Sequence, residues 1–345
     1  MRALSASQAV VPAFERTRRL LFRPFEWATY LKLAAVACIT EGLFGAFNFS
    51  SNRSSSSESI ALPTAHLAPQ TIAILIFCSI VVPGLGLVFY YTVIRLRFAF
   101  FHCLVHQTKE IGPAWDLYER QSMRLFIASL LVWAGFLLMV LAVIAALAVV
   151  VFTVFTLKTP DGKLDPGVFF ILFYPCIGLA FTVAMSAISA EVTLHDFILP
   201  HMAMEDATFR EAWAAARSRI WVDRESFFSY FILRLLLPFV ACFALLVAAA
   251  IPLLIVSWIL STSATGFRDL FDDATGVSAF LGVFIQMLFV LLGIGIGLLA
   301  IFGLGGPVAA WMRYYALFFY GSRYKALGDV LVPPELSGTG ESHIS

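Results

Sequence analysis

The sequence is poor in charge. Of its 345 residues, 13% are Asp, Glu, Lys or Arg, whereas 60% are hydrophobic and 15% are aromatic. Soluble globular chains are about one quarter charged and about half apolar. A soluble chain of this length could not bury so much apolar surface, so the surrounding medium must be lipid. The composition therefore predicts an integral membrane protein.

Cysteine is also scarce, and catalytic motifs are missing. The five cysteines lie in or beside apolar runs without a CxxC pair, which argues against a zinc ribbon or a disulfide framework. The chain has no GxSxG motif, no Walker loop and no pair of carboxylates placed for acid–base chemistry. No soluble basic domain points to nucleic acid. We therefore predict no enzymatic activity, no cofactor and no nucleic-acid partner.

Long apolar runs are what the chain has in abundance. A membrane span needs about 20 such residues to cross a hydrocarbon core of about 30 Å. The apolar runs at 123–157, 227–260 and 277–312 are too long for a perpendicular crossing, so they must tilt, kink or project beyond the bilayer. The pattern predicts an all-α polytopic transmembrane bundle of about six spans, near residues 28–49, 71–94, 123–157, 168–194, 227–260 and 277–312.

The basic residues predict the orientation of these spans. Only four of the 23 Lys and Arg residues lie in the alternate loops 50–70, 158–167 and 261–276, namely Arg53, Lys158, Lys163 and Arg268. Basic residues concentrate on the cytoplasmic side of membrane proteins. We therefore expect a multi-pass protein of the bacterial cytoplasmic (inner) membrane with both termini cytoplasmic. The serine-rich segment 50–70 is then an external loop, and residues 333–345 read as a disordered tail.

A loose repeat of about one hundred residues runs through the chain. Three segments each begin with Ala followed by an aromatic residue (Phe14, Trp115 or Trp213), continue through arginines and enter an apolar hairpin. Such self-similarity predicts three units within a single membrane domain of residues 1–345. The units would cover residues 13–94, 114–194 and 212–312, each an interfacial helix followed by two spans.

The segments before the hairpins have the composition of amphipathic cytoplasmic helices. Arginine meets anionic headgroups, and aromatic side chains favour the boundary between water and lipid. Trp213, Arg217 and Trp221 are spaced by four and would share one helical face. A docking face for a membrane-protein partner or a second copy of the chain is the alternative. The predicted lipid contacts are Arg16, Arg18, Arg19, Trp115, Trp213, Arg217 and Trp221.

The stretch HDFILPHMAMED, residues 195–206, gathers histidines and acidic residues where the fourth span ends. His201 and Glu205 are four apart, as are His102 and His106, so they are weak candidates for metal ligands. The alternative, which we favour, is that polar residues return where the helix leaves the membrane. We also expect Pro200 to break the helix, so that its flanking His and Glu residues need not converge.

Glu41 and Gln286 are polar positions within apolar runs. A carboxylate in lipid is costly and usually faces the bundle interior or a cavity. Glu41 therefore predicts a proton or cation relay or a substrate contact; the alternatives are a protonated carboxyl, or a carboxyl near the outer boundary. Gln286 favours a hydrogen bond between helices. Glycine and proline at residues 83–86 and 293–307 indicate either close helix packing or interrupted spans of the kind found in transporters.

Two stretches carry a family resemblance. AFERTRRLLFRPFEWATYLKL and DFILPHMAMEDATFREAW resemble uncharacterised prokaryotic six-span membrane proteins, which are similar to the membrane domain of some glycerophosphodiester phosphodiesterases. The residues that carry the likeness are Arg19, Leu21, Phe22, Pro24, Phe25, Asp196, Phe197, Pro200, Met202, Ala212 and Trp213. The resemblance implies the membrane fold. It does not imply phosphodiesterase activity, since the catalytic domain is missing.

The leading functional prediction is a non-enzymatic inner-membrane protein that engages lipid or organises a membrane partner. The alternative is a small-molecule or ion transporter. Transport would require Glu41, Gln286 and the glycine- and proline-interrupted spans to line one cavity.

Overall fold

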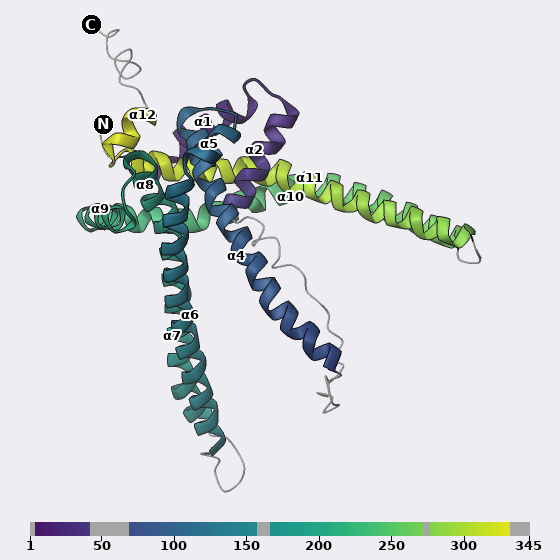
Figure 1. Cartoon of the computed structure of the whole chain (residues 1–345), viewed down its shortest axis with the longest axis horizontal. Helices are drawn as coiled ribbons and strands as arrows, with labels where there is room; N and C mark the ends of the chain where they lie inside the picture. Colours follow the sequence, from purple (N-terminus) through teal and green to yellow (C-terminus); the bar gives the residue numbers. More distant parts are fainter. Residues whose placement is uncertain (1–3, 42–68, 157–165, 272–276, 332–345) are drawn as a thin grey trace. The chain divides into compact units, whose positions relative to one another are not determined.

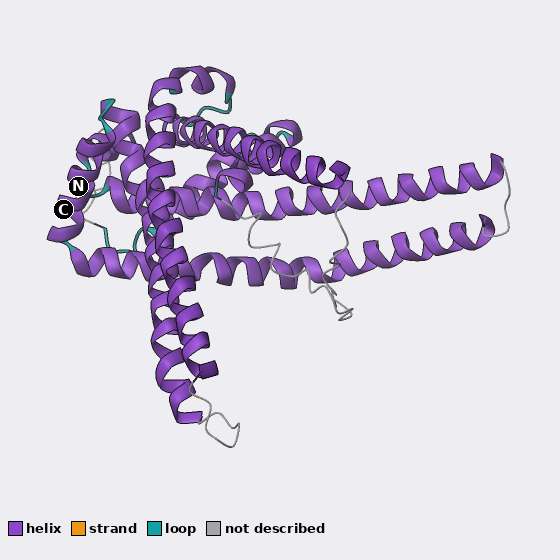
Figure 2. Cartoon of the chain, turned by 60° about the horizontal axis from the view of Figure 1, so that its bottom comes forward, coloured by secondary structure: helices purple, strands orange, loops and turns teal. Residues whose placement is uncertain are grey.

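The computed structural model describes residues 4–41, 69–156, 166–271 and 277–331. These residues form helices joined by short turns, as Figures 1 and 2 show. The prediction of an all-α polytopic bundle is confirmed. The predicted external loop 50–70, apart from its last two residues, and the tail 333–345 lie outside the described residues. In chain order the helices are α1 (Val10–Phe22), α2 (Trp27–Thr40), α4 (Pro69–His106), α5 (Gly112–Leu117), α6 (Glu119–Thr156), α7 (Pro166–Val192), the π-helix η2 (Thr193–Ile198), α8 (Leu199–Glu205), α9 (Phe209–Val222), α10 (Arg224–Phe271), α11 (Val277–Gly321) and α12 (Lys325–Leu331).

Among the described residues, five helical stretches are long and apolar enough to cross a membrane, and they overlap the second to sixth predicted spans. The predicted first span, 28–49, is described only as far as Glu41. Its helix α2 has 14 residues, fewer than the roughly 20 that a crossing needs. The five stretches are Phe77–His106, Glu119–Thr153, Phe173–Glu205, Arg224–Val247 and Phe280–Gly321.

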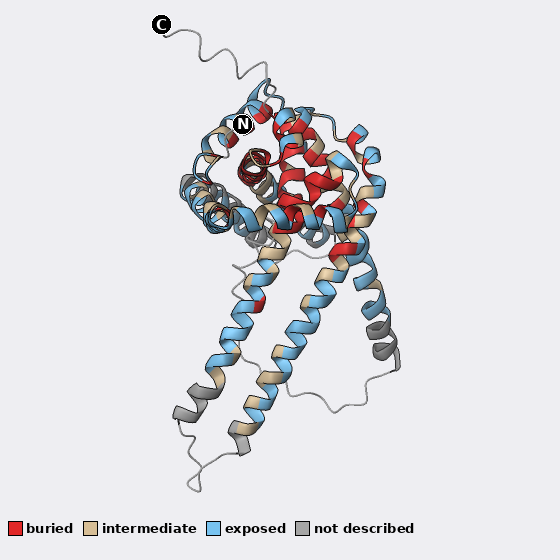
Figure 3. Cartoon of the chain, turned by 90° about the vertical axis from the view of Figure 1, so that its left-hand side faces the viewer, coloured by how far each residue is buried: buried red, intermediate tan, exposed pale blue. Residues whose placement is uncertain are grey.

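The helices group into two compact units. Unit 1 comprises Met1–Ala114 and Glu225–Ser345, and unit 2 comprises Trp115–Arg224. In each unit the buried residues gather at one end of the long helices, and the rest of their length exposes apolar side chains (Figure 3). We call the packed end of each unit its base. Exposed apolar helices of this length are stable only in lipid, so the bases must contain the parts that meet water.

In unit 1, helix α2 packs against α11 at a point where the two backbones approach closely. A Cβ added to Gly306 would lie 2.5 Å from the Cα of Ala34, so glycine is required there. One turn to either side, the Tyr30 hydroxyl donates a hydrogen bond to the Gly303 carbonyl at 2.6 Å, and Cys38 Sγ lies 3.8 Å from the Ile301 carbonyl. Half of α2 is buried in protein in this way, which sets it apart from the five long helices.

The base of unit 1 brings both ends of the described chain together. The backbone N–H of Leu4 donates to the Ser322 hydroxyl at 3.1 Å, and Arg323 donates to the Leu4 carbonyl at 2.9 Å. The Tyr314 hydroxyl donates to the Leu104 carbonyl at 3.0 Å, which joins the ends of α11 and α4. Tyr230 of α10 stacks on Phe319 of α11 with ring centroids 4.4 Å apart.

In unit 2, α6 and α7 run side by side as a hairpin (Figure 1), and η2, α8 and α9 form its base. The buried base residues include Ser122, Leu125, His195, Asp196 and His201. Because these side chains are polar as well as apolar, this end of the hairpin is chemically distinct from its exposed arms.

The expectation that Pro200 breaks the helix is wrong. The chain stays helical from Pro166 to Glu205, with Pro200 in the first turn of α8. A proline ring normally collides with the carbonyl four residues earlier, here that of Asp196. The π-turn η2 contains Asp196 and widens the helix just before the ring, as the hydrogen bond from Leu199 N–H to the Leu194 carbonyl five residues earlier shows.

Candidate functional site

Helix α9 begins at a capping box between Thr208 and Glu211. The Glu211 carboxylate accepts from the Thr208 backbone N–H at 2.8 Å, and the Thr208 hydroxyl accepts from the Glu211 backbone N–H at 3.4 Å. The hydrogen bond from the Thr208 backbone, and secondarily the Thr208 side chain, stabilise the charged carboxylate and hold the pKa of Glu211 below its usual value. Asp206 just before has φ of 48° and reverses the chain between α8 and α9.

The inner face of α9 is fixed to the base of unit 2. Ala212 and Ala216 are buried on this face, and their small side chains allow close packing. Arg219 donates from Nη1 to His201 Nε2 at 2.5 Å. An arginine only donates, so Nε2 must carry the lone pair and the proton must sit on Nδ1, which faces Glu205 Oε2 at 3.4 Å. His201 is therefore neutral here and links α8 to α9.

The outer face of α9 carries an exposed aromatic and basic stripe. Its members, spaced by four, are the half-buried Phe209 and the exposed Trp213, Arg217 and Trp221, and we call them the α9 stripe. Trp213 and Trp221 are 43% and 54% exposed. Phe209 stacks on Trp213 with ring centroids 6.4 Å apart, and the Arg224 guanidinium lies 3.7 Å from the centroid of the Trp221 ring. The structure thus places the three predicted residues of this helix on one exposed face.

The other predicted lipid contacts differ in their surroundings. Arg18 and Arg19 are exposed on α1, opposite the buried face that contains Thr17. Arg16 turns toward the side-chain amide of Gln107 at the end of α4. Trp115 is half-buried in α5. Arg18 and Arg19 are consequently accessible to headgroups, whereas Arg16 already contacts protein.

Sequence reasoning missed an aromatic cluster at the turn between α1 and α2. Phe22, Phe25, Trp27 and Tyr30 touch one another with ring centroids 5.0 to 6.1 Å apart. Tyr30 is buried, whereas the other three rings are each at least 44% exposed. The signal was present in FRPFEWATY, where four aromatics occur within nine residues. Together with the nearby Arg18 and Arg19, this cluster gives unit 1 a second aromatic and basic surface.

The histidines do not form a recognisable metal centre within the described ranges, where no group of three or more His, Cys, Asp or Glu side chains converges. His102 and His106 have ring centroids 4.4 Å apart at the end of α4 in unit 1. His201 and Glu205 lie in unit 2, where His201 serves the link to α9. The metal candidates thus form two separate pairs, each in its own unit.

Glu41, at the end of α2, is paired with arginine. Its Oε2 lies 2.5 Å from Arg234 Nη2, and its Oε1 lies 3.9 Å from Arg313 Nε. Arg97 Nε donates to the adjacent Thr40 carbonyl at 2.7 Å. The Glu41 side chain is 12% exposed and that of Arg313 is 2% exposed. These arginines belong to segments that the charge distribution assigns to the cytoplasmic side, so a position for Glu41 near the outer boundary would move them outside as well.

The predicted interruptions of two spans are absent from the described helices. Helix α4 continues through Pro83, and α11 continues through Pro307. Gly305 and Gly306 pack against α2, whereas Gly84, Gly86 and Gly297 have nothing within 4 Å of an added Cβ. Gln286 is exposed on the arm of α11. The interrupted spans on which the transporter alternative depended are therefore not found in this part of the chain.

Comparison with known proteins identifies a family but no activity. Residues 4–330 match the family of unknown function DUF7544, and the chain belongs to this family. No curated protein and no solved structure matches the chain. The uncharacterised-family part of the expected resemblance is thus supported, whereas the likeness to the membrane domain of glycerophosphodiester phosphodiesterases stays a prediction.

Proposed function

We infer that this member of a family of unknown function is a multi-pass protein of the bacterial cytoplasmic membrane that binds anionic phospholipid at its cytoplasmic face. The α9 stripe is the principal contact, and the surface formed by Arg18, Arg19 and the aromatic cluster of unit 1 is a second one. The observation that carries the proposal is the exposure of Trp213, Arg217 and Trp221 on one face of a helix whose other face is fixed to protein.

Physical chemistry supports lipid as the ligand of the α9 stripe. Tryptophan has an apolar body and a polar N–H, so it favours the zone between headgroups and acyl chains. An arginine near an anionic leaflet contributes about 1 kcal/mol of attraction. Because the capping box and the Arg219–His201 bond hold α9 in place, the stripe meets the membrane without first ordering a disordered segment.

The base of unit 1 supports the proposed orientation of the protein in the membrane. Hydrogen bonds from Leu4 to Ser322 and from Arg323 to Leu4 place both ends of the described chain at the same end of the unit. Both termini are therefore expected in one compartment. The abundance of arginine at this end favours the cytoplasm.

Hydrogen exchange of α9 in nanodiscs tests the proposal. The protein is placed in discs of phosphatidylcholine alone, or of phosphatidylcholine with about 30% phosphatidylglycerol. We expect slower exchange of α9 in the anionic discs. Arg217→Gln should reduce this anionic effect up to about fivefold, the equivalent of about 1 kcal/mol. Arg120→Gln removes an exposed arginine of α6 in the same unit and is the control.

Two results would overturn the proposal. The first is equal exchange of α9 in both kinds of disc. The second is an Arg217→Gln variant that behaves like Arg120→Gln. Slow exchange of α9 that depends on protein concentration and not on phosphatidylglycerol would instead identify the stripe as a contact between copies of the chain.

A further inference from the structure

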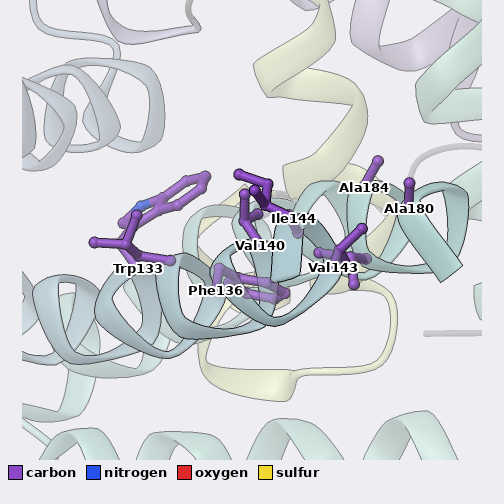
Figure 4. A pocket seen from close by; sticks show the side chains of 10 residues that line it. Trp133, Phe136, Val140, Val143, Ile144, Ala180 and Ala184 are labelled. Carbon is purple, nitrogen blue, oxygen red and sulfur yellow. The ribbon is translucent and has the colours of Figure 1, made fainter. Parts of the chain in front are cut away.

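The hairpin of unit 2 contains an apolar groove between α6 and α7 (Figure 4). Large side chains of α6, among them Trp133, Phe136 and Val140, form one wall. The facing positions of α7 include Ala180 and Ala184, whose small side chains leave a volume of about 470 Å³ between the helices. Apart from the indole N–H of Trp133, the side chains that line the groove are hydrocarbon, so the groove offers water almost no hydrogen-bond partners.

The position of the groove along the hairpin matches one leaflet of a bilayer. From Trp133 to Ile144 the helix rises about 16 Å, at 1.5 Å per residue, and half of a hydrocarbon core of about 30 Å is about 15 Å. At its Trp133 end the groove meets the base, where Ser129 of α6 and Leu194 of η2 are buried. Trp133 itself is a residue typical of the boundary between acyl chains and headgroups.

The mean cross-section of the groove limits which kind of molecule can enter it. A volume of about 470 Å³ spread over about 16 Å gives a mean cross-section of roughly 30 Å². A helix with side chains is at least about 10 Å wide and needs roughly 80 Å². The groove is open on one side, so a second helix can lie over it but cannot enter it, whereas a single hydrocarbon chain can enter. An acyl chain is already in an apolar medium, so the groove retains it through closer packing and not through the hydrophobic effect.

We propose that this groove holds one acyl chain of a phospholipid from the cytoplasmic leaflet. The inference deepens the proposed function and rests on it for the orientation of the hairpin. The two sites are chemically different. The α9 stripe recognises headgroup charge, whereas the groove recognises a hydrocarbon chain and is indifferent to the headgroup.

Photo-crosslinking distinguishes a retained chain from ordinary contact with lipid. The protein is placed in nanodiscs that contain phosphatidylcholine with a diazirine at the middle of one acyl chain, and the crosslinked residues are mapped by mass spectrometry. We expect the yield on the groove face of α6, around Val140, to exceed that on its opposite face, around Ala142, at least fivefold. Ala142 is exposed and points away from the groove, so it reports bulk lipid at the same depth.

Filling the groove supplies the decisive comparison. Ala184→Leu should lower crosslinking on the groove face at least fivefold, and Ala142→Leu adds the same side chain to the opposite face and should leave it unchanged. Ala187→Leu, one turn nearer the base, is a second filling variant in case Ala184→Leu is not recovered as a single species. Equal yields on both faces of α6, or no loss in either filling variant, would overturn the inference.

The same samples separate the two proposals. If α9 exchanges equally in neutral and anionic discs while the groove is labelled and is blocked by Ala184→Leu, the headgroup proposal fails alone. If the anionic effect on α9 persists while the groove shows no preference, the acyl-chain inference fails alone.

Discussion

Helices α2 and α11 of unit 1 approach each other closely at Ala34 and Gly306, and this contact gives a specific prediction for Gly306→Ala. The added methyl group would lie 2.5 Å from the Cα of Ala34, and closer still to its Cβ. The obstacle is backbone and a methyl group, so no change of rotamer can relieve it. Either α2 moves away from α11 or both backbones bend, and overpacking of this kind typically costs about 1–3 kcal/mol.

Gly297→Ala is the matched control on the same helix. Nothing lies within 4 Å of a Cβ at this position, so the methyl group meets only lipid. Replacing glycine by alanine in a helix gains up to about 1 kcal/mol, because the unfolded chain loses conformational freedom. The two variants make the same chemical change, but Gly306→Ala should lower the free energy of unfolding and Gly297→Ala should raise it. Their free energies of unfolding should therefore differ by about 1–4 kcal/mol.

Thermal inactivation in detergent measures this difference. Each variant is heated, and the fraction that still elutes as one species from size-exclusion chromatography gives an apparent midpoint. One kcal/mol corresponds to roughly 2–4 °C for chains of 150–250 residues and to less for longer chains. We expect Gly306→Ala to fall several degrees below wild type and Gly297→Ala to match or exceed it. Adding Ala34→Gly to Gly306→Ala should restore part of the loss. Equal midpoints for the two glycine variants would refute the α2–α11 crossing.

Three further predictions concern the ion pairs of Glu41, the cap of α9 and the hydrogen bond between Arg219 and His201. Glu41→Gln leaves two arginines without their carboxylate and should cost about 3–5 kcal/mol by the same assay, whereas Glu26→Gln at an exposed position should cost little. Thr208→Ala should cost about 1 kcal/mol and speed hydrogen exchange at the start of α9. Because folding lowers the pKa of Glu211, the stability from its carboxylate is present above the unfolded pKa and is lost as the pH falls through the folded pKa, so the start of α9 in the wild type should also exchange faster in acid. Arg219→Leu breaks the bond to α8 and should make tryptic cleavage within α9 several times faster at unchanged protein concentration.

The long spans could be predicted because their signal is local. The runs that become α4, α6, α7, α10 and α11 are each longer than a bilayer requires, and hydropathy alone identifies them. The shared face of Trp213, Arg217 and Trp221 was predictable for the same reason, since a spacing of four sets a helical face wherever the helix lies.

The environment of α2 could not be predicted from its own residues. An apolar run has the same composition whether it is buried in lipid or in protein, so residues 28–49 carried no signal that α2 packs against α11. The partners of Glu41 were equally inaccessible. They lie 193 and 272 positions later in the chain, and no periodicity connects them.

The prediction that Pro200 breaks the helix failed for a different reason. The rule that proline ends a helix assumes regular α-helical geometry before it. In this chain the preceding turn is π-helical, and the helix therefore passes through the proline and carries His201 to Arg219. A sequence rule for π-turns is lacking, so the link between α8 and α9 had no signal beyond the clustering of polar residues.

The polar base of unit 2 also determines how deeply its hairpin sits in the membrane. Helix α6 has 38 residues and is about 57 Å long, nearly twice the hydrocarbon thickness. Moving the base into the bilayer would bring Arg120 and Arg124 of α6 and the buried Asp196 toward the hydrocarbon, at a cost of about 2.5–3.5 kcal/mol for each charge at the bilayer centre. Moving the base away from the bilayer would expose apolar residues of the arms to water. In the proposed orientation this balance would hold Trp133 near the cytoplasmic boundary, and the groove beyond it would then face the acyl chains of one leaflet only.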